Sequence, residues 1–118
     1  MDILEVLKIL SDTTRLRILN ILYDGDLCVC EIEYVLELTQ SNASRHLNNM
    51  SKAKVLESYK VNKYTYYKIN EEIYKDYPFV KEVIGKELLK NSMLKEDKNK
   101  LDAYKNSGLN CDCLTKKY

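Results

Sequence analysis

The spacing of apolar residues changes near position 54, and this change limits what the chain can fold into. Before it, apolar side chains recur at the spacing of one helix face. After it, Val, Ile and Tyr are concentrated in two short runs, 55–60 and 64–69, as in paired strands. The sequence therefore predicts a mainly α fold with one small β-hairpin. The predicted helices before the change are 2–10, 14–23, a third beginning near Cys28, and 40–53.

Turn-forming residues separate these elements. Residues 24–26 read Asp-Gly-Asp, which ends the second helix, and residues 11–13 offer N-cap candidates for its start. Thr39 is a further N-cap candidate, in the short turn between the third and fourth helices. Two helices joined by a tight turn and followed by a hairpin predict a winged helix-turn-helix, with Asn62 as a left-handed residue at the tip of the wing.

The C-terminal half continues as helix. A helix restarts at Asn70, is interrupted by Pro78, and carries an apolar stripe that we expect to lie exposed and to form a dimer seam. We expect residues 91–118 to form a helix that frays near Tyr104, followed by a flexible tail. The predicted organisation is a DNA-binding and dimerisation domain over 1–90 and a C-terminal helix extension with a cysteine-containing tail over 91–118. The stripe consists of Val80, Val83, Ile84 and Leu88.

The four cysteines form two CxC pairs, Cys28 with Cys30 and Cys111 with Cys113. The N-terminus has no apolar run typical of a signal peptide, and no stretch approaches the roughly 18 apolar residues that a membrane span needs. We therefore expect a cytoplasmic protein without a membrane partner, in which thiols stay reduced. The pairs are then interpreted as metal ligands or redox groups, not as structural disulfides.

Positive charge is concentrated in the middle of the chain. The formal net charge is only +1, but residues 39–69 hold six basic side chains against one acidic side chain. Residues 1–38, by contrast, hold three basic and eight acidic side chains. Such a local basic region suits a polyanion such as double-stranded DNA, although a solvated basic surface remains the alternative interpretation.

The fourth predicted helix has the composition of a recognition helix. Its first turns present short hydrogen-bonding groups and one cation, which are the side chains that contact base edges in the major groove. The basic wing follows it directly. His46 is the only histidine in the chain, so no site with several histidine ligands is possible, and we interpret it as a packing or phosphate-contacting residue. The polar face consists of Gln40, Ser41, Ser44 and Arg45, and the wing lysines are Lys60, Lys63 and Lys68.

The chain resembles the ArsR/SmtB family of metal- and metalloid-responsive winged-helix repressors over about residues 1–90. Four motifs in order carry the resemblance: ILSDTTRLRIL (9–19), DLCVCEI (26–32), QSNASRHL (40–47) and YTYYKI (64–69). The resemblance implies a homodimer that binds an operator and leaves it when an inducing ion binds. It also implies the DNA contacts, which are Gln40, Ser41, Ser44 and Arg45, with Lys60 and Lys63 on the wing. At the wing tip this chain has Asn62 where relatives often have Gly.

The thiols indicate which inducers to expect. Thiolates are soft ligands that suit As(III), Sb(III), Cd(II), Pb(II) and Zn(II). On a regular helix residues two apart point in different directions, so a CxC pair holds one ion only by distorting the helix, which makes a plausible switch. Relatives with a third cysteine in this helix have it where this chain has Glu33. The tail pair, Cys111 and Cys113, offers a third thiolate from the same or the partner chain. Alternatively, all four sulfurs enclose Cd(II), Pb(II) or Zn(II) tetrahedrally, or the tail is dispensable.

The expected function is therefore a repressor released by As(III) or Sb(III), not an enzyme. Alternatives are a repressor that responds to Cd(II), Pb(II) or Zn(II), a thiol redox regulator, and a structural zinc module. No CxxC motif of oxidoreductase type accompanies the cysteines. The expected ligands are Cys28, Cys30, Cys111 and Cys113.

Overall fold

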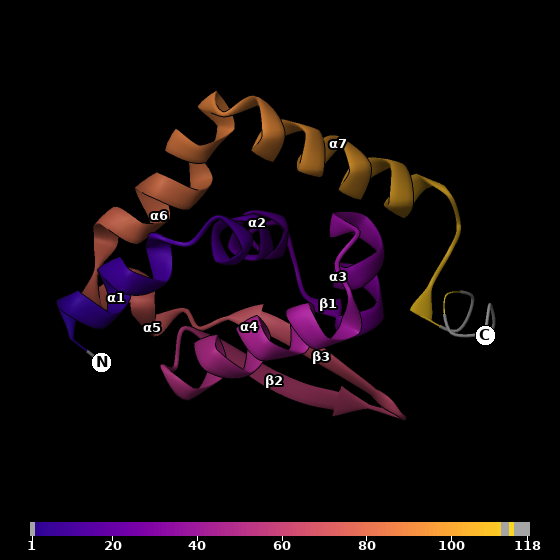
Figure 1. The fold of residues 1–118 in the computed structure, drawn as a ribbon, viewed down its shortest axis with the longest axis horizontal. Helices are drawn as coiled ribbons and strands as arrows, with labels where there is room; N and C mark the ends of the chain where they lie inside the picture. The colour runs from indigo at the N-terminus through magenta and orange to yellow at the C-terminus, as the bar shows by residue number, and fades with distance from the viewer. Residues whose placement is uncertain (1, 112–113, 115–118) are drawn as a thin grey trace.

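The computed structural model describes residues 2–111 and 114 (Figure 1). A bundle of helices lies over a small antiparallel sheet, as the sequence predicts. The order of elements is α1 (Ile3–Leu10), α2 (Thr13–Leu22), β1 (Leu27–Cys28), α3 (Val29–Leu36), α4 (Gln40–Lys52), β2 (Leu56–Val61), β3 (Tyr64–Ile69), α5 (Glu72–Asp76), α6 (Pro78–Gly85), the 3₁₀ helix η1 (Glu87–Lys90) and α7 (Ser92–Asn106).

Side-chain caps fix where the helices start. Asp2 and Asp12 accept hydrogen bonds from backbone N–H groups in the first turns of α1 and α2, and Thr39 does the same for α4. Helices α3 and α4 are joined by a turn in which Glu37 has a left-handed backbone, with φ of 55°. The predicted helix-turn-helix is therefore present at α3 and α4.

The wing contains one more strand than predicted. Strands β2 and β3 pair along six residues each, and Asn62 adopts the left-handed φ of 58° that the sequence predicts for the tip. The additional strand, β1, pairs with β3 and places Cys28 opposite Tyr66, giving the sheet order β1-β3-β2. Cys28 therefore belongs to the sheet, and only Cys30 lies inside helix α3.

The prediction that the apolar stripe after Asn70 is exposed is wrong. Helix α6 packs against α2, and Val80 and Ile84 are 1% and 0% exposed. The approach is close, because a Cβ atom at Gly85 would collide with the Tyr23 ring. Helix α1 carries three exposed apolar residues, Ile3, Leu4 and Leu7, which are 41%, 73% and 49% exposed.

Helix α7 is longer and better anchored than a fraying extension. It runs across α2 and α3 on the side away from the wing (Figure 1). Its own residues Leu94, Leu101 and Tyr104 are buried against the rest of the chain. Residues after α7 descend beside α3, so that Cys111 lies next to the wing strand β3. Among the described residues, none of the helices is long and apolar enough to cross a membrane.

Candidate nucleic-acid interface and thiol site

Helix α4 presents a polar face to solvent. Its apolar face is anchored by Leu47 and Met50, both 0% exposed. The opposite face carries the residues predicted to contact DNA, of which three are exposed and one is half-buried. The exposed residues are Gln40, Ser41 and Arg45, and the half-buried one is Ser44.

His46 is a packing residue on the inner side of α4. It is 5% exposed, and burial lowers the pKa of its ring, while nearby Asp12 acts in the opposite direction. Its Nδ1 atom lies 4.0 Å from Asp12 Oδ2. The neighbouring Arg45 points outward, and its guanidinium donates a hydrogen bond of 2.7 Å to Asn42 Oδ1. The two adjacent basic residues therefore have different surroundings.

The wing combines exposed lysines with stacked tyrosines. Lys60 and Lys63 are exposed, on β2 and on the turn that follows it. The rings of Tyr59 and Tyr66 stack across the two strands with their centroids 5.7 Å apart. Tyr59 also donates a hydrogen bond of 2.6 Å to Asp26, and this bond raises the pKa of Tyr59 to about 12. The wing is thereby attached to the turn that leads into β1.

Cys28 lies at the junction between the sheet and the helix-turn-helix. It is the last residue of β1, opposite Tyr66, and also the N-cap residue of α3, with an extended backbone. Its side chain is 1% exposed. A movement of Cys28 would therefore act on α3 and on the wing together.

The structure joins Cys28 to Cys111 by a disulfide bond, across 83 residues of sequence. The expectation that these thiols stay unpaired is therefore wrong for this structure, because the path of the chain after α7 brings Cys111 to the N-terminus of α3. The Tyr66 hydroxyl lies 3.9 Å from Cys111 Sγ. Cys113 lies outside the described residues.

Cys30 is separated from this pair. It has a free thiol, and burial raises its pKa, with the Glu33 carboxylate acting in the same direction. Both effects disfavour the thiolate. The two members of the CxC pair therefore have different neighbours, Cys111 for one and Glu33 for the other.

Glu31 is a site residue that the sequence analysis missed. One of its carboxylate oxygens accepts a hydrogen bond of 2.9 Å from the Cys28 N–H, and the other accepts one from the Tyr104 hydroxyl of α7. Ligand atoms of Cys28, Glu31 and Cys111 all lie within 4.8 Å of one another. The spacing of Glu31 three residues after an N-cap was the available signal, because it is the spacing of a capping box.

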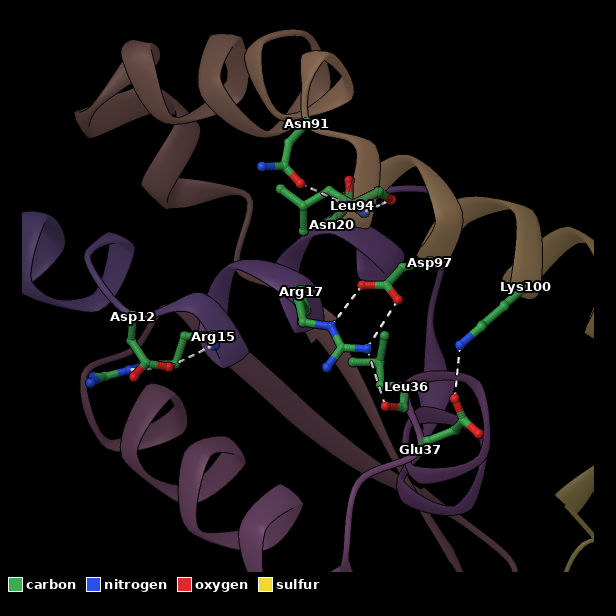
Figure 2. Close-up of polar contacts among 10 residues, drawn as sticks. All are labelled: Asp12, Arg15, Arg17, Asn20, Leu36, Glu37, Asn91, Leu94, Asp97 and Lys100. Carbon is green, nitrogen blue, oxygen red and sulfur yellow. Dashed lines mark hydrogen bonds and ion pairs between the residues drawn. The ribbon is translucent and has the colours of Figure 1, made fainter.

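Polar contacts attach α7 to both ends of α3. Figure 2 shows Arg17 forming an ion pair with Asp97 of α7 while donating a hydrogen bond to the Leu36 carbonyl, at distances of 2.8 and 3.2 Å. Lys100 pairs with Glu37, just beyond α3, at 2.8 Å. Tyr104 contacts Glu31 at the other end of α3. The thiol site and the C-terminus of α3 therefore share one supporting helix.

Comparisons with known proteins agree with this architecture. The model of a family described as bacterial regulatory protein, arsR family, matches residues 12–58, which include α2, α3 and α4. This chain belongs to the ArsR family. Within the family it is 41% identical to the arsenic resistance transcriptional regulator ArsR1 of Pseudomonas putida over 69 residues, 58% of this chain and 54% of that protein.

Other proteins that are similar to this chain have names that do not mention arsenic. A homolog of the cadmium resistance transcriptional regulatory protein CadC from Staphylococcus aureus is 36% identical over 73 residues, 61% of this chain and 60% of that protein. This chain thus spans between half and two thirds of the length of both relatives. Among solved structures, HlyU of Vibrio cholerae is similar with a TM-score of 0.60 and 27% identity, over 68% of this chain and 88% of that one. A solved winged helix-turn-helix DNA-binding domain of Mycobacterium bovis is similar in fold, with a TM-score of 0.61 and 24% identity over 76% of this chain and 84% of that one.

Proposed function

We propose that this chain is a transcriptional repressor that binds operator DNA as a homodimer and releases it when an ion binds its cysteine thiolates. The inducers we propose first are As(III) and Sb(III), with Cd(II), Pb(II) and Zn(II) as alternatives. The observation that carries the proposal is the position of Cys28, which joins α3 to the wing sheet. An ion bound there acts on the wing directly and on the recognition helix α4 through α3, against which α4 packs.

The DNA-binding face that we propose consists of α4 and the wing. Exposed polar groups at the start of α4 suit base edges in the major groove, and lysines on the wing suit phosphates. Few acidic side chains interrupt this surface, since Glu57 is the only one in residues 39–69. The proposed contacts are Gln40, Ser41, Ser44, Arg45, Lys60 and Lys63.

Dimerisation is proposed through α1. Its three exposed apolar side chains would otherwise remain in water, and a twofold axis beside α1 would bury them against their copies. A dimer also places two α4 helices on one duplex, which gives an inverted repeat as the natural operator.

Ion binding at Cys28 would favour a conformation that does not fit DNA. The backbone N–H of Cys28 is part of the α3 cap, and its strand pairs with β3. An ion that draws Cys28 toward other thiolates changes the start of α3 and the base of the wing in the same movement. Induction requires only that the ion binds this conformation more tightly than the DNA-bound one. The names of the arsenic- and cadmium-resistance relatives support an ion of this soft class.

A DNA-binding titration tests the proposal. Reduced, ion-free protein is first used to select duplexes from a random library, and binding to the selected DNA is followed by fluorescence anisotropy. We expect tight, salt-sensitive binding that As(III), Sb(III) or Cd(II) reverses. Cys28→Ser should retain DNA binding and lose the release, because serine keeps the size of cysteine without the soft thiolate. If arsenite releases DNA from Cys28→Ser at the concentration that releases it from the wild type, Cys28 is not a sensing ligand.

Cys30→Ser is the matched control variant. If release persists in this variant, the sensing ligands are Cys28 and the tail cysteines, Cys111 and Cys113. If the ion no longer releases DNA from this variant, Cys28 and Cys30 both bind the ion. In that case α3 must open to bring Cys30 toward Cys28.

A redox regulator is the second proposed function, and the Cys28–Cys111 disulfide favours it. A peroxide can form it by accepting two electrons and two protons from the two thiols, with water or an alcohol as the reduced product. The bond then fixes Cys111 against the base of the wing. This function predicts that oxidised and reduced protein differ in DNA affinity without any ion. Cys111→Ser should abolish that difference, and equal affinities in the wild type would exclude the redox function.

A further inference from the structure

Three ligand atoms converge where β1 ends and α3 begins. The sulfurs of Cys28 and Cys111 and a carboxylate oxygen of Glu31 lie within 4.8 Å of one another. Both cysteines are buried, at 1% and 4% exposure, and Glu31 is half-buried beside them. The two sulfurs are bonded to each other in the disulfide, so only its reduction frees them as two thiolates. Two such thiolates and the neighbouring oxygen are the donors of a mixed site for a borderline divalent cation.

The Glu31 carboxylate is already oriented. The Cys28 N–H donates to one of its oxygens and the Tyr104 hydroxyl to the other, so both the position and the rotation of the group are fixed. Each oxygen keeps a lone pair after accepting one hydrogen bond. Ligating carboxylates in proteins are commonly held by such hydrogen bonds.

We propose that Cys28, Glu31 and Cys111 of one chain form a divalent-cation site when the disulfide is reduced, with Glu31 as the oxygen ligand and Tyr104 as its positioning residue. Reduction adds two electrons and two protons to the disulfide. A water-soluble phosphine supplies the electrons in vitro and becomes a phosphine oxide, taking its oxygen from water. Binding of the cation then releases the two thiol protons as two metal–sulfur bonds form.

The oxygen ligand determines the class of ion. Cd(II) and Zn(II) accept mixed sulfur and oxygen ligands, whereas arsenite bonds to sulfur and gains nothing from a carboxylate. The inference rests on the proposed function, and assigns its divalent-cation inducers a binding site with an oxygen ligand within one chain. Cys30 is excluded from this set because its thiol lies with Glu33 and outside the cluster.

Cadmium binding to the full chain tests the site without DNA. Reduced protein is freed of phosphine and titrated with Cd(II) against a chromophoric chelator, and the cadmium–sulfur absorption band reports the number of thiolates. The test variant is Glu31→Gln, which keeps an oxygen acceptor for the cap but loses the carboxylate. Glu33→Gln is the matched control on the same helix. Tyr104→Phe removes only the positioning hydroxyl.

We expect Glu31→Gln to weaken Cd(II) binding by more than about tenfold and Tyr104→Phe to weaken it less, with Glu33→Gln and Cys30→Ser close to wild type. Arsenite affinity should change little in Glu31→Gln, Glu33→Gln and Tyr104→Phe, because these three variants keep every cysteine. Cadmium NMR of the wild-type protein gives a second readout that needs no variant, since its shift separates a two-sulfur site from a four-sulfur one. A four-sulfur shift, or a loss in Cys30→Ser equal to or greater than that in Glu31→Gln, would overturn the site.

The site and the proposed function can fail separately. Cd(II) that binds through Glu31 without releasing DNA supports the site and contradicts induction by divalent cations. Release of DNA by Cd(II) that is equal in wild type and Glu31→Gln supports the repressor function and contradicts the carboxylate ligand.

Discussion

At the scale of single residues, Arg45 and His46 are neighbours in α4 with opposite environments. Arg45 is exposed and held by Asn42, whereas His46 is packed against the N-terminus of α2 near Asp12. The helix period accounts for the difference, because adjacent residues point about 100° apart. The two positions therefore lead to separate predictions, one for DNA and one for stability.

Arg45→Ala should weaken binding to the selected operator by about 1–3 kcal/mol if its guanidinium contacts a base edge. Binding to random DNA should change much less, because non-specific binding depends on phosphate contacts. Lys63→Ala is the comparison and should weaken both kinds of binding alike. Anisotropy titrations on both duplexes measure the difference. An equal loss on both duplexes for Arg45→Ala would assign Arg45 to phosphate contact.

His46 should make the protein less stable in mild acid. Burial lowers its pKa below the ordinary value of 6.5, so the unfolded chain binds a proton more readily than the folded one. The contribution of neutral His46 to the free energy of unfolding is complete above about pH 6.5, the pKa in the unfolded chain. It decreases as the pH falls toward the lower pKa of the folded protein. Urea unfolding across pH 5 to 8 measures this slope. In His46→Gln the slope in this window should be absent, and an unchanged slope would assign it to other groups.

At the scale of elements, α7 supports α3 at both ends. The Arg17–Asp97 ion pair holds α7 near the C-terminus of α3, and Tyr104 holds Glu31 at its N-terminus. Asp97 is 2% exposed, and the pair raises the pKa of Arg17, in keeping with a carboxylate that stabilises the charged guanidinium. Tyr104 of α7 positions Glu31, which lies beside Cys28 and Cys111. A change that detaches α7 should therefore also release Glu31 from its position.

Asp97→Ala should lower the free energy of unfolding by about 3 kcal/mol, since it leaves a partly buried arginine without its partner. This loss of stability is at the low end of the range for buried ion pairs. The Arg17 side chain is 19% exposed, so water can solvate part of its charge when Asp97 is absent. Chemical denaturation of the reduced protein is the measurement. The control is Asp102→Ala, at an exposed position of the same helix, which should cost little. Similar losses in both variants would remove the ion pair as the cause.

At the scale of the whole molecule, α1 carries three exposed apolar side chains, Ile3, Leu4 and Leu7. Leu4 is 73% exposed, more than any other large apolar side chain among the described residues. Helix α6, which carries the stripe expected at the seam, is used within the chain to cover α2. The proposed dimer therefore forms through the first helix.

Leu7→Glu should weaken dimerisation and, with it, operator binding, because a charge would be buried against its own copy across a twofold axis. Sedimentation at several protein concentrations measures the dimer, and circular dichroism checks that the chain stays folded. Met93→Glu is the control, since Met93 is exposed to a similar extent on α7. A dimer as stable as wild type in Leu7→Glu would exclude α1 as the seam.

The sequence by itself determined the elements whose signals are local. Asp12 and Thr39 cap the helices that follow them, and Asn62 supplies the left-handed residue that the wing turn needs. Each signal acts within about four residues, so it can be read without knowing the rest of the fold. The helix-turn-helix, the wing and the polar face of α4 follow from such signals.

Only the tertiary structure decided what surrounds Cys28. Strand β1 exists because β3 offers it a partner, and two residues are too few to show a strand pattern in sequence. Cys111 and Tyr104 reach the N-terminus of α3 from 83 and 73 residues away, through the docking of α7. The packing of α6 on α2 buried Val80 and Ile84, which the sequence analysis expected to be exposed. Periodicity shows that a helix has an apolar face but not which surface covers it, because that choice depends on contacts between segments far apart in the chain.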